Sequence, residues 1–121
     1  MSQRVPWTDV LVCDPVTMIN AFTVPLEESE RFLERWRDNV RAMSGQPGFV
    51  RARMYRCLVN DAELRFVNTA EWDSGKDLAQ ARANPEWRAS MQRMLDDPEL
   101  HITPRPGIYQ VAVDVHPGDS L

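Results

Sequence analysis

Two asparagines stand in segments of this 121-residue chain that otherwise carry the apolar residues of strands. A buried carboxamide must find hydrogen-bond partners, and a functional pocket is one good reason to keep Asn20 and Asn68 in such surroundings. Asn68 and Trp72 are four residues apart, so a strand directs both side chains to the same face as Phe66. Carboxamides can hold an oxygen atom on which negative charge develops, and an indole can pack against rings while donating its N–H.

Each of these residue types also has a purely structural interpretation. Without further context, Trp72 and Trp36 are more often plain core residues than parts of a site. Arginines on strands more often form ion pairs than bind an acidic substrate. His101 and His116 are most simply loop and tail residues, although His101 is also a candidate general base.

Composition excludes several classes of protein. With 43% apolar residues, the length suits one compact domain. The net charge of −4, with no run of like charge, makes nucleic acid an unexpected partner. The longest uncharged apolar stretch, residues 16–26, is too short to span a bilayer, so no membrane segment is expected. The first residues lack a basic start followed by an apolar run, which predicts a cytoplasmic location.

The cysteines do not predict a metal site. Cys13 and Cys57 lie far apart, with no second thiol or histidine near either. This spacing fits neither the usual zinc motifs nor a CxxC redox motif. We expect no metal, and we expect both thiols to be reduced.

The first half of the chain predicts a strand followed by a helix. Residues 16–24 are rich in β-forming side chains, and the strand ends at Pro25. Proline and the acids that follow it suit the first turn of a helix. Residues 26–43 then place apolar side chains on one helical stripe, and residues 44–48, with two glycines and a proline, end the helix.

The second half predicts two strands, helical segments and a final strand. Residues 49–59 and 63–72 alternate in polarity and predict an antiparallel hairpin. Asp73-Ser74 can cap the start of a helix that continues to Arg82. Asn84-Pro85 can begin another helix, which carries Trp87, Met91, Met94 and Leu95. Residues 96–106 contain three prolines and predict a long loop, and residues 107–115 predict the last strand.

The order of these elements is the ferredoxin-like βαββαβ pattern of an α+β domain. We expect the domain to span residues 16–115, with an N-terminal arm at 1–15 and a C-terminal tail at 116–121. The helices should cover one sheet face. The other face carries Glu71 and several arginines, too mixed for a monomer core, so we expect a homodimer that packs sheet to sheet.

Four stretches together resemble the antibiotic biosynthesis monooxygenase family. They are Asn20-Ala-Phe-Thr-Val-Pro25, Phe32-Leu-Glu-Arg-Trp36, Gln46-Pro-Gly-Phe-Val50, which leads into Arg53-Met-Tyr-Arg56, and Arg65-Phe-Val-Asn-Thr-Ala-Glu-Trp72. The resemblance runs over residues 16–115 and implies a dimeric α+β barrel with a pocket between the sheet and the helices. It implies a monooxygenase that uses dioxygen, with no metal, flavin or other cofactor, to convert an anthrone-like or hydroquinone-like aromatic polyketide to a quinone in secondary-metabolite biosynthesis.

The resemblance also suggests roles for individual residues. It implies Asn20, Asn68 and Trp72 as catalytic residues. The predicted substrate-binding residues are Phe22, Trp36, Met54, Phe66, Leu78, Met91 and His101. Leu78 occupies the position of a tyrosine seen in one such oxygenase.

Other members of this fold have other activities. Haem degraders carry an Asn–Trp–His set, of which this chain matches only Asn20, because Ala81 and Met91 occupy the other two positions. The haem-degrading interpretation is therefore disfavoured. A polyketide cyclase or isomerase using the same pocket, and a ligand-binding domain without turnover, remain alternatives at this stage.

Overall fold

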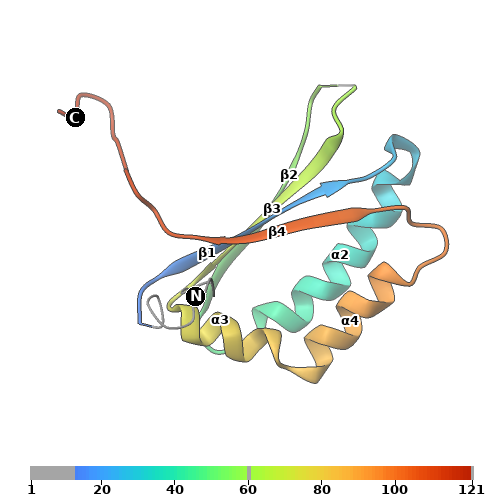
Figure 1. Ribbon diagram of the computed structural model, residues 1–121, viewed down its shortest axis with the longest axis horizontal. Helices are drawn as coiled ribbons and strands as arrows, with labels where there is room; N and C mark the ends of the chain where they lie inside the picture. Colours follow the sequence, from blue (N-terminus) through green and yellow to red (C-terminus); the bar gives the residue numbers. More distant parts are fainter. Residues whose placement is uncertain (1–12, 60, 121) are drawn as a thin grey trace, which may run out of the picture.

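The chain folds as a four-stranded antiparallel sheet with helices on one face. A computed structural model describes residues 13–59 and 61–120 (Figure 1). The strands are β1 (Val16–Thr23), β2 (Phe49–Arg56), β3 (Leu64–Trp72) and β4 (Thr103–Tyr109). The helical elements are the 3-10 helix η1 (Leu26–Glu28), α2 (Ser29–Ser44), α3 (Gly75–Arg82) and α4 (Pro85–Leu95). The sheet order β2-β3-β1-β4 confirms the predicted α+β, ferredoxin-like βαββαβ class. Among the described residues, no helix is long and apolar enough to cross a membrane.

Strand β1 lies inside the sheet, which has one face covered by helices and one open face. Its residues alternate between buried and half-buried along its whole length. Figure 1 shows α2, α3 and α4 on the same side of the sheet. Because side chains alternate across a strand, Met18, Asn20 and Phe22 face the helices, whereas Ile19 and Ala21 face the open side.

Two groups of apolar side chains hold the helices on the sheet. In the first, the indole of Trp72 stacks on Trp87 of α4, with ring centroids 6.0 Å apart. In the second, Phe32 of α2 lies between Phe22 and Phe66, at centroid distances of 4.9 and 5.0 Å. Burying these large rings supplies most of the attraction between the two layers.

The predicted caps of the two short helices are present. The Ser74 hydroxyl accepts a hydrogen bond from the Asp77 N–H at 3.1 Å, and Asn84 Oδ1 accepts from the N–H groups of Glu86 and Trp87. Pro85 then occupies the first position of α4, where its missing N–H costs nothing. These caps fix where α4 begins, and therefore which of its side chains face the sheet.

The final strand was misplaced by sequence reasoning. We predicted a loop over residues 96–106 and a strand over residues 107–115, but β4 spans Thr103–Tyr109. Its pairing with β1 extends from Thr23 opposite Thr103 to Thr17 opposite Tyr109. Residues beyond Tyr109 therefore run past the start of β1, and those that the structure describes belong to no strand.

The prolines of β4 led us to predict a loop. A strand at the edge of a sheet tolerates proline, however, and β4 is such a strand. The amides of Thr103 and Arg105 point toward β1, where they donate to Thr23 Oγ1 at 3.1 Å and to Asn20 Oδ1 at 3.0 Å. Successive amides of a strand point in opposite directions, so the nitrogens of Pro104 and Pro106 face away from β1. No ladder hydrogen bond is lost at either proline.

The chain beyond β4 leaves the sheet in an extended path, as Figure 1 shows. Val111 and Val113 are 75% and 76% exposed, and Val115 is also exposed. The predicted N-terminal arm, at residues 1–15, falls mostly outside the described residues.

A buried carboxylate ties α2 to the turn after α4. Asp97 accepts hydrogen bonds from Arg31 Nε at 2.9 Å and Nη2 at 3.1 Å, from Arg35 Nε at 2.9 Å and from the Glu99 N–H at 2.9 Å. The Arg31 hydrogen bonds come first among the causes that hold the pKa of Asp97 well below its usual range. Because this turn leads into β4, the carboxylate also positions the edge of the sheet.

The depressed pKa of Asp97 predicts how stability depends on pH. Replacing it with asparagine (Asp97→Asn) should lower the urea midpoint at neutral pH, because two guanidinium groups lose their charged partner. The unfolded pKa of an aspartate is about 3.9, and stability from a lowered folded pKa is present above that value and lost as the pH falls toward the folded pKa. The gap between wild type and variant should therefore narrow below about pH 4.

Urea unfolding followed by tryptophan fluorescence at a series of pH values measures this effect. Asp38→Asn is a matched control, since its exposed ion pair with Arg41 lies on the surface of α2. A pH-independent gap for Asp97→Asn, or an equal loss in both variants, would contradict the assigned role.

Candidate functional site

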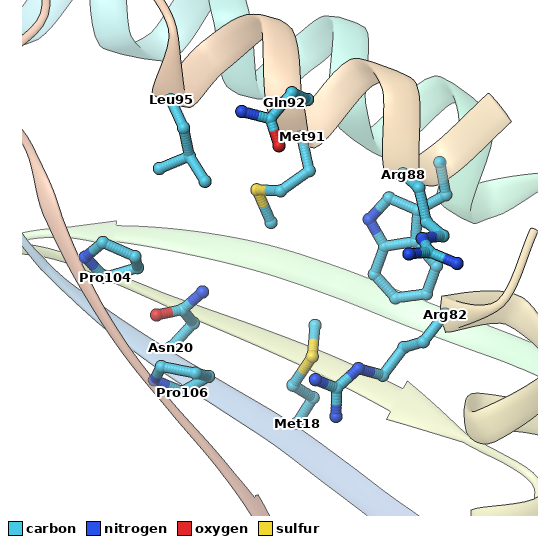
Figure 2. A pocket seen from close by; sticks show the side chains of 10 residues that line it. Met18, Asn20, Arg82, Arg88, Met91, Gln92, Leu95, Pro104 and Pro106 are labelled. Carbon is cyan, nitrogen blue, oxygen red and sulfur yellow. The ribbon is translucent and has the colours of Figure 1, made fainter. Parts of the chain in front are cut away.

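A cavity of about 340 Å³ lies between the covered face of the sheet and α4. Its volume is at the small end of the range for small-molecule sites, about 300–1,000 Å³. Figure 2 shows α4 along one side of it and strand residues along the other. The lining residues are Met18, Asn20, Arg82, Trp87, Arg88, Met91, Gln92, Leu95, Pro104 and Pro106.

Helix α4 supplies half of this lining because of its periodicity. Met91 and Gln92 are each three or four residues from both Arg88 and Leu95, so the four side chains share one helical face. On its α2 side, the Ser90 hydroxyl accepts a hydrogen bond from Asn39 Nδ2 at 2.8 Å, in a buried position. This bond sets the rotation of α4 and thereby directs the lining face toward β1 and β4.

Asn20 is the polar residue at the sheet side of the cavity. It is 4% exposed, and its Oδ1 accepts a hydrogen bond from the Arg105 N–H at 3.0 Å. Holding the oxygen toward β4 leaves the carboxamide nitrogen directed into the cavity, beneath Met91, as Figure 2 shows. The site therefore presents a fixed hydrogen-bond donor in surroundings that are otherwise largely apolar.

Asn68 lies beside Asn20 but does not line the cavity. The two residues are direct partners in the pairing of β1 with β3. Asn68 is buried, and its Nδ2 donates to the carbonyl oxygens of Arg53 at 3.0 Å and Thr69 at 3.3 Å. Its amide hydrogens are thus occupied by the backbone, so Asn68 supports the sheet beneath the site and can offer only its oxygen.

Trp72 also lies behind the lining. It is 1% exposed and packs between Phe49 and Trp87, whose own ring forms part of the cavity wall. Among the described residues, nothing accepts a hydrogen bond from Trp72 Nε1, although that atom is buried. The structure therefore places Trp72 as a support for Trp87.

The predicted substrate-binding residues separate into several places. Met91 lines the cavity, whereas Phe22, Phe66 and Leu78 are buried within the apolar groups. Two more, Met54 and Trp36, are half-buried on β2 and α2 and are not part of the lining.

His101 lies away from the cavity, in the turn before β4. Its Nδ1 is 2.6 Å from Glu28 Oε2, and its backbone N–H donates to Glu28 Oε1 at 2.6 Å. This backbone hydrogen bond, first among the causes, lowers the pKa of the Glu28 carboxyl. His101 thus has a structural partner in Glu28, and it is not among the residues that line the cavity.

Sequence reasoning missed most of the lining. Met18 was not proposed as a site residue, and Trp87 was expected on a helix without a role in the site. Pro104 and Pro106 were assigned to a loop. Arg82, Arg88, Gln92 and Leu95 were not proposed as site residues. The interval of three or four residues from Arg88 to Leu95 was a usable signal for one shared face. Nothing in the sequence indicated that β4 would lie opposite it.

The chemistry of the lining favours binding and hydrogen bonding over metal coordination. Within residues 13–59 and 61–120, no group of three histidines, cysteines or acids is placed to hold a metal ion. The described lining contains no imidazole, thiol or phenol, the usual protein ligands of haem iron apart from methionine. Its donor set thus does not fit the His-ligated haem of the degraders. What it offers is the Asn20 amide, two guanidinium groups and an apolar wall.

Several solved structures are similar to this chain. One is SnoaB, a cofactor-independent oxygenase from Streptomyces nogalater, with 26% identity, a TM-score of 0.71, and coverage of 84% of this chain and 97% of that chain. Another is a putative monooxygenase from Shewanella loihica PV-4, with 29% identity, a TM-score of 0.65 and the same coverage, 84% and 97%. A variant of MhuD with two manganese protoporphyrin IX molecules per active site has 24% identity, a TM-score of 0.64, and coverage of 84% and 98%. At that identity the likeness concerns the fold alone.

The sequence comparisons agree with this fold. A search of curated proteins found no significant match. The sequence model of the family described as antibiotic biosynthesis monooxygenase matches residues 15–93, which is well over half of the chain. The matched range includes β1, β2, β3, α3 and most of α4. The chain therefore belongs to the antibiotic biosynthesis monooxygenase family.

Proposed function

We propose that this protein oxidises an anthrone-type or hydroquinone-type aromatic polyketide to a quinone with dioxygen, without metal or flavin, in secondary-metabolite biosynthesis. The observation that carries the proposal is the buried carboxamide of Asn20, which Arg105 orients so that its nitrogen enters the cavity. Membership of a monooxygenase family and similarity to a cofactor-independent oxygenase support the reaction class.

The cavity suits a flat aromatic body. Met18 and Met91 approach it from the sheet and from α4, and the ring of Trp87 forms part of its wall. Thioethers and an indole make favourable contacts with aromatic rings. A phenol or carbonyl oxygen of the substrate then accepts a hydrogen bond from Asn20 Nδ2.

The reaction needs the substrate to become an anion. An anthrone loses a proton from its CH2 group to water, since the described lining offers neither a carboxylate nor an imidazole. Negative charge moves to the carbonyl oxygen, where the Asn20 donor stabilises it. The anion gives one electron to dioxygen, and the resulting radical and superoxide join as a peroxide at the same carbon. Loss of water completes the conversion of CH2 and O2 into C=O and H2O.

Asn68 and Trp72 hold other residues of the site in position. Asn68 pairs with Asn20 across the strands and fixes the local sheet through its own hydrogen bonds to the backbone. Trp72 stacks on Trp87 and so sets the position of the wall that the substrate contacts. Both are positioning residues, and Asn20 is the catalytic one.

We also infer that two copies pair through the open face of the sheet. Ile19 and Ala21 of β1 and Val67 of β3 are only half-buried there. Arg51 and Glu71 form an ion pair on the same face at 3.0 Å. An apolar strip with polar margins is typical of an interface between protein subunits. The cavity lies on the other face of the sheet, so pairing leaves it open.

The proposed role of Asn20 predicts the effect of two substitutions. Asn20→Ala removes the donor and should lower kcat by about 100-fold, as for other oxyanion donors. Asn20→Asp keeps the acceptor for the Arg105 N–H but places a negative charge beside the developing anion, so its loss should be at least as large. Oxygen uptake with 1,8-dihydroxyanthrone, in metal-free and flavin-free protein, measures both rates against spontaneous oxidation.

Gln80→Ala is a matched control, because it deletes an exposed carboxamide from α3 outside the cavity. It should leave uptake unchanged. Wild-type uptake at only the spontaneous rate would contradict the oxygenase proposal, and product formation without oxygen would favour a cyclase or isomerase. Saturable binding without any turnover would favour a ligand-binding domain.

The proposed dimer predicts how a substitution on the open face changes the oligomeric state. Ile19→Glu places a charge in the middle of the open face and should convert the dimer to a folded monomer, as read by light scattering after size exclusion. Leu26→Glu changes an exposed residue of η1 and should remain dimeric. A wild-type monomer, or a dimer that persists in Ile19→Glu, would show that this face is not the interface.

A further inference from the structure

The helix side of the cavity presents a hydrogen-bond acceptor. Gln92 lies in the second half of α4 and lines the cavity beside Met91. Its Nε2 donates a hydrogen bond to Asp96 Oδ1 at 2.8 Å, one helical turn further along the chain. Figure 2 shows the Gln92 side-chain oxygen directed from α4 toward the strands. This oxygen therefore faces a ligand that enters the cavity.

Asp96 fixes the orientation of this carboxamide. An ionised carboxylate has only acceptor atoms, so the group of Gln92 that meets it must be the NH2 group. The carbonyl oxygen of the same carboxamide then points away from Asp96. Within residues 13–59 and 61–120, no group donates a hydrogen bond to that oxygen. Asp96 is not part of the lining, so it holds the carboxamide from outside the cavity.

Gln92 and Asn20 present opposite groups to the cavity. The Asn20 oxygen accepts from the Arg105 N–H, which leaves its nitrogen for a ligand, whereas the Gln92 nitrogen donates to Asp96, which leaves its oxygen. Figure 2 shows Asn20 among the strands and Gln92 on the helix. A ligand thus meets a donor on the sheet side and an acceptor on the helix side. This pair suits a molecule with an acceptor oxygen at one position and a hydroxyl group at another.

We propose that Gln92 determines substrate specificity by accepting a hydrogen bond from a phenolic hydroxyl group of the aromatic substrate. The inference rests on the proposed function, since it assigns the substrate class of the same cavity. That class is a ring system with a free hydroxyl group in addition to the oxygen that Asn20 binds. A ligand that fills the cavity covers the Gln92 oxygen, so a ligand without the hydroxyl leaves this acceptor unpaired.

The acceptor also influences where the substrate loses a proton. A carbonyl oxygen stabilises a protonated hydroxyl group as its donor and repels a phenolate. On the sheet side, the Asn20 donor stabilises an oxygen on which negative charge develops. The pair therefore keeps the hydroxyl at Gln92 neutral and favours the anion whose charge lies on the oxygen at Asn20.

The proposal predicts a preference between two quinones that differ in their hydroxyl groups. In 2,6-dihydroxyanthraquinone the hydroxyls lie too far from the ring carbonyls to bond with them, so they can donate to the protein. 2,6-Dimethoxyanthraquinone keeps the oxygen atoms but has no donor. Quenching of tryptophan fluorescence reports binding, because Trp87 lines the cavity. At mildly acidic pH, where the hydroxyls are protonated, wild type should bind the dihydroxy ligand about three- to tenfold more tightly, as for one neutral hydrogen bond.

Substitutions assign the preference to Gln92. Gln92→Met keeps the length of the side chain without the acceptor, so it should weaken binding of the dihydroxy ligand about three- to tenfold and leave the dimethoxy ligand unchanged. Asp96→Ala allows the carboxamide to rotate and should reduce the preference about twofold. Gln80→Met makes the same change on α3, outside the cavity, and is the matched control. All three replaced residues are exposed, so thermal unfolding should remain close to wild type.

Each outcome decides the proposal. A preference that is lost in Gln92→Met and kept in Gln80→Met supports it. Equal affinity of wild type for the two quinones, no saturable binding of the dihydroxy ligand, or a preference that survives in Gln92→Met would overturn it. Selective binding of the dihydroxy ligand without oxygen uptake from an anthrone would overturn only the oxygenase proposal. Oxygen uptake without this preference would overturn only the role of Gln92.

Discussion

The antiparallel pairing of β1 with both β3 and β4 is the constraint on which the site depends. This pairing sets Asn20 opposite Asn68 on one side and opposite Pro106 on the other. A shift of one residue would turn Asn20 to the open face and bring Ala21 or Ile19 beneath α4. The hydrogen bond from the Arg105 amide to Asn20 belongs to the same arrangement, because only this register brings the two groups together. The geometry of the donor is thus a consequence of the sheet itself.

Helix α4 completes the cavity, and its position depends on polar contacts as well as on apolar packing. The Asn84 cap fixes where the helix starts, the Asn39–Ser90 hydrogen bond fixes its rotation, and Asp97 fixes the turn that follows it. Trp87 is then held against Trp72 on the sheet. The contacts of Asn84, Ser90 and Asp97 lie outside the lining, so they hold the helix in place while Arg88, Met91 and Gln92 remain free to meet a ligand. Stability and function are in this way divided between two faces of one helix.

Local signals in the sequence were sufficient for the fold but only partly for the site. Strand alternation, the proline at the start of α4 and the two caps predicted every element except the last strand. Pro104 and Pro106 concealed that strand, because their tolerance depends on its being at a sheet edge. Asn20 and Met91 were predicted as site residues and line the cavity. Arg82 and Arg88 could not be distinguished from surface arginines, because their place beside the cavity is visible only once the chain is folded.

The central claim is that the substrate binds between β1, β4 and α4 with an oxygen on Asn20. A crystal structure with a bound anthraquinone tests it most directly. The account predicts the rings between Met18 and Met91, with a quinone oxygen about 2.7–3.2 Å from Asn20 Nδ2, the usual hydrogen-bond distance. A quinone bound on the open face of the sheet, or beside His101 and Glu28, would contradict the account.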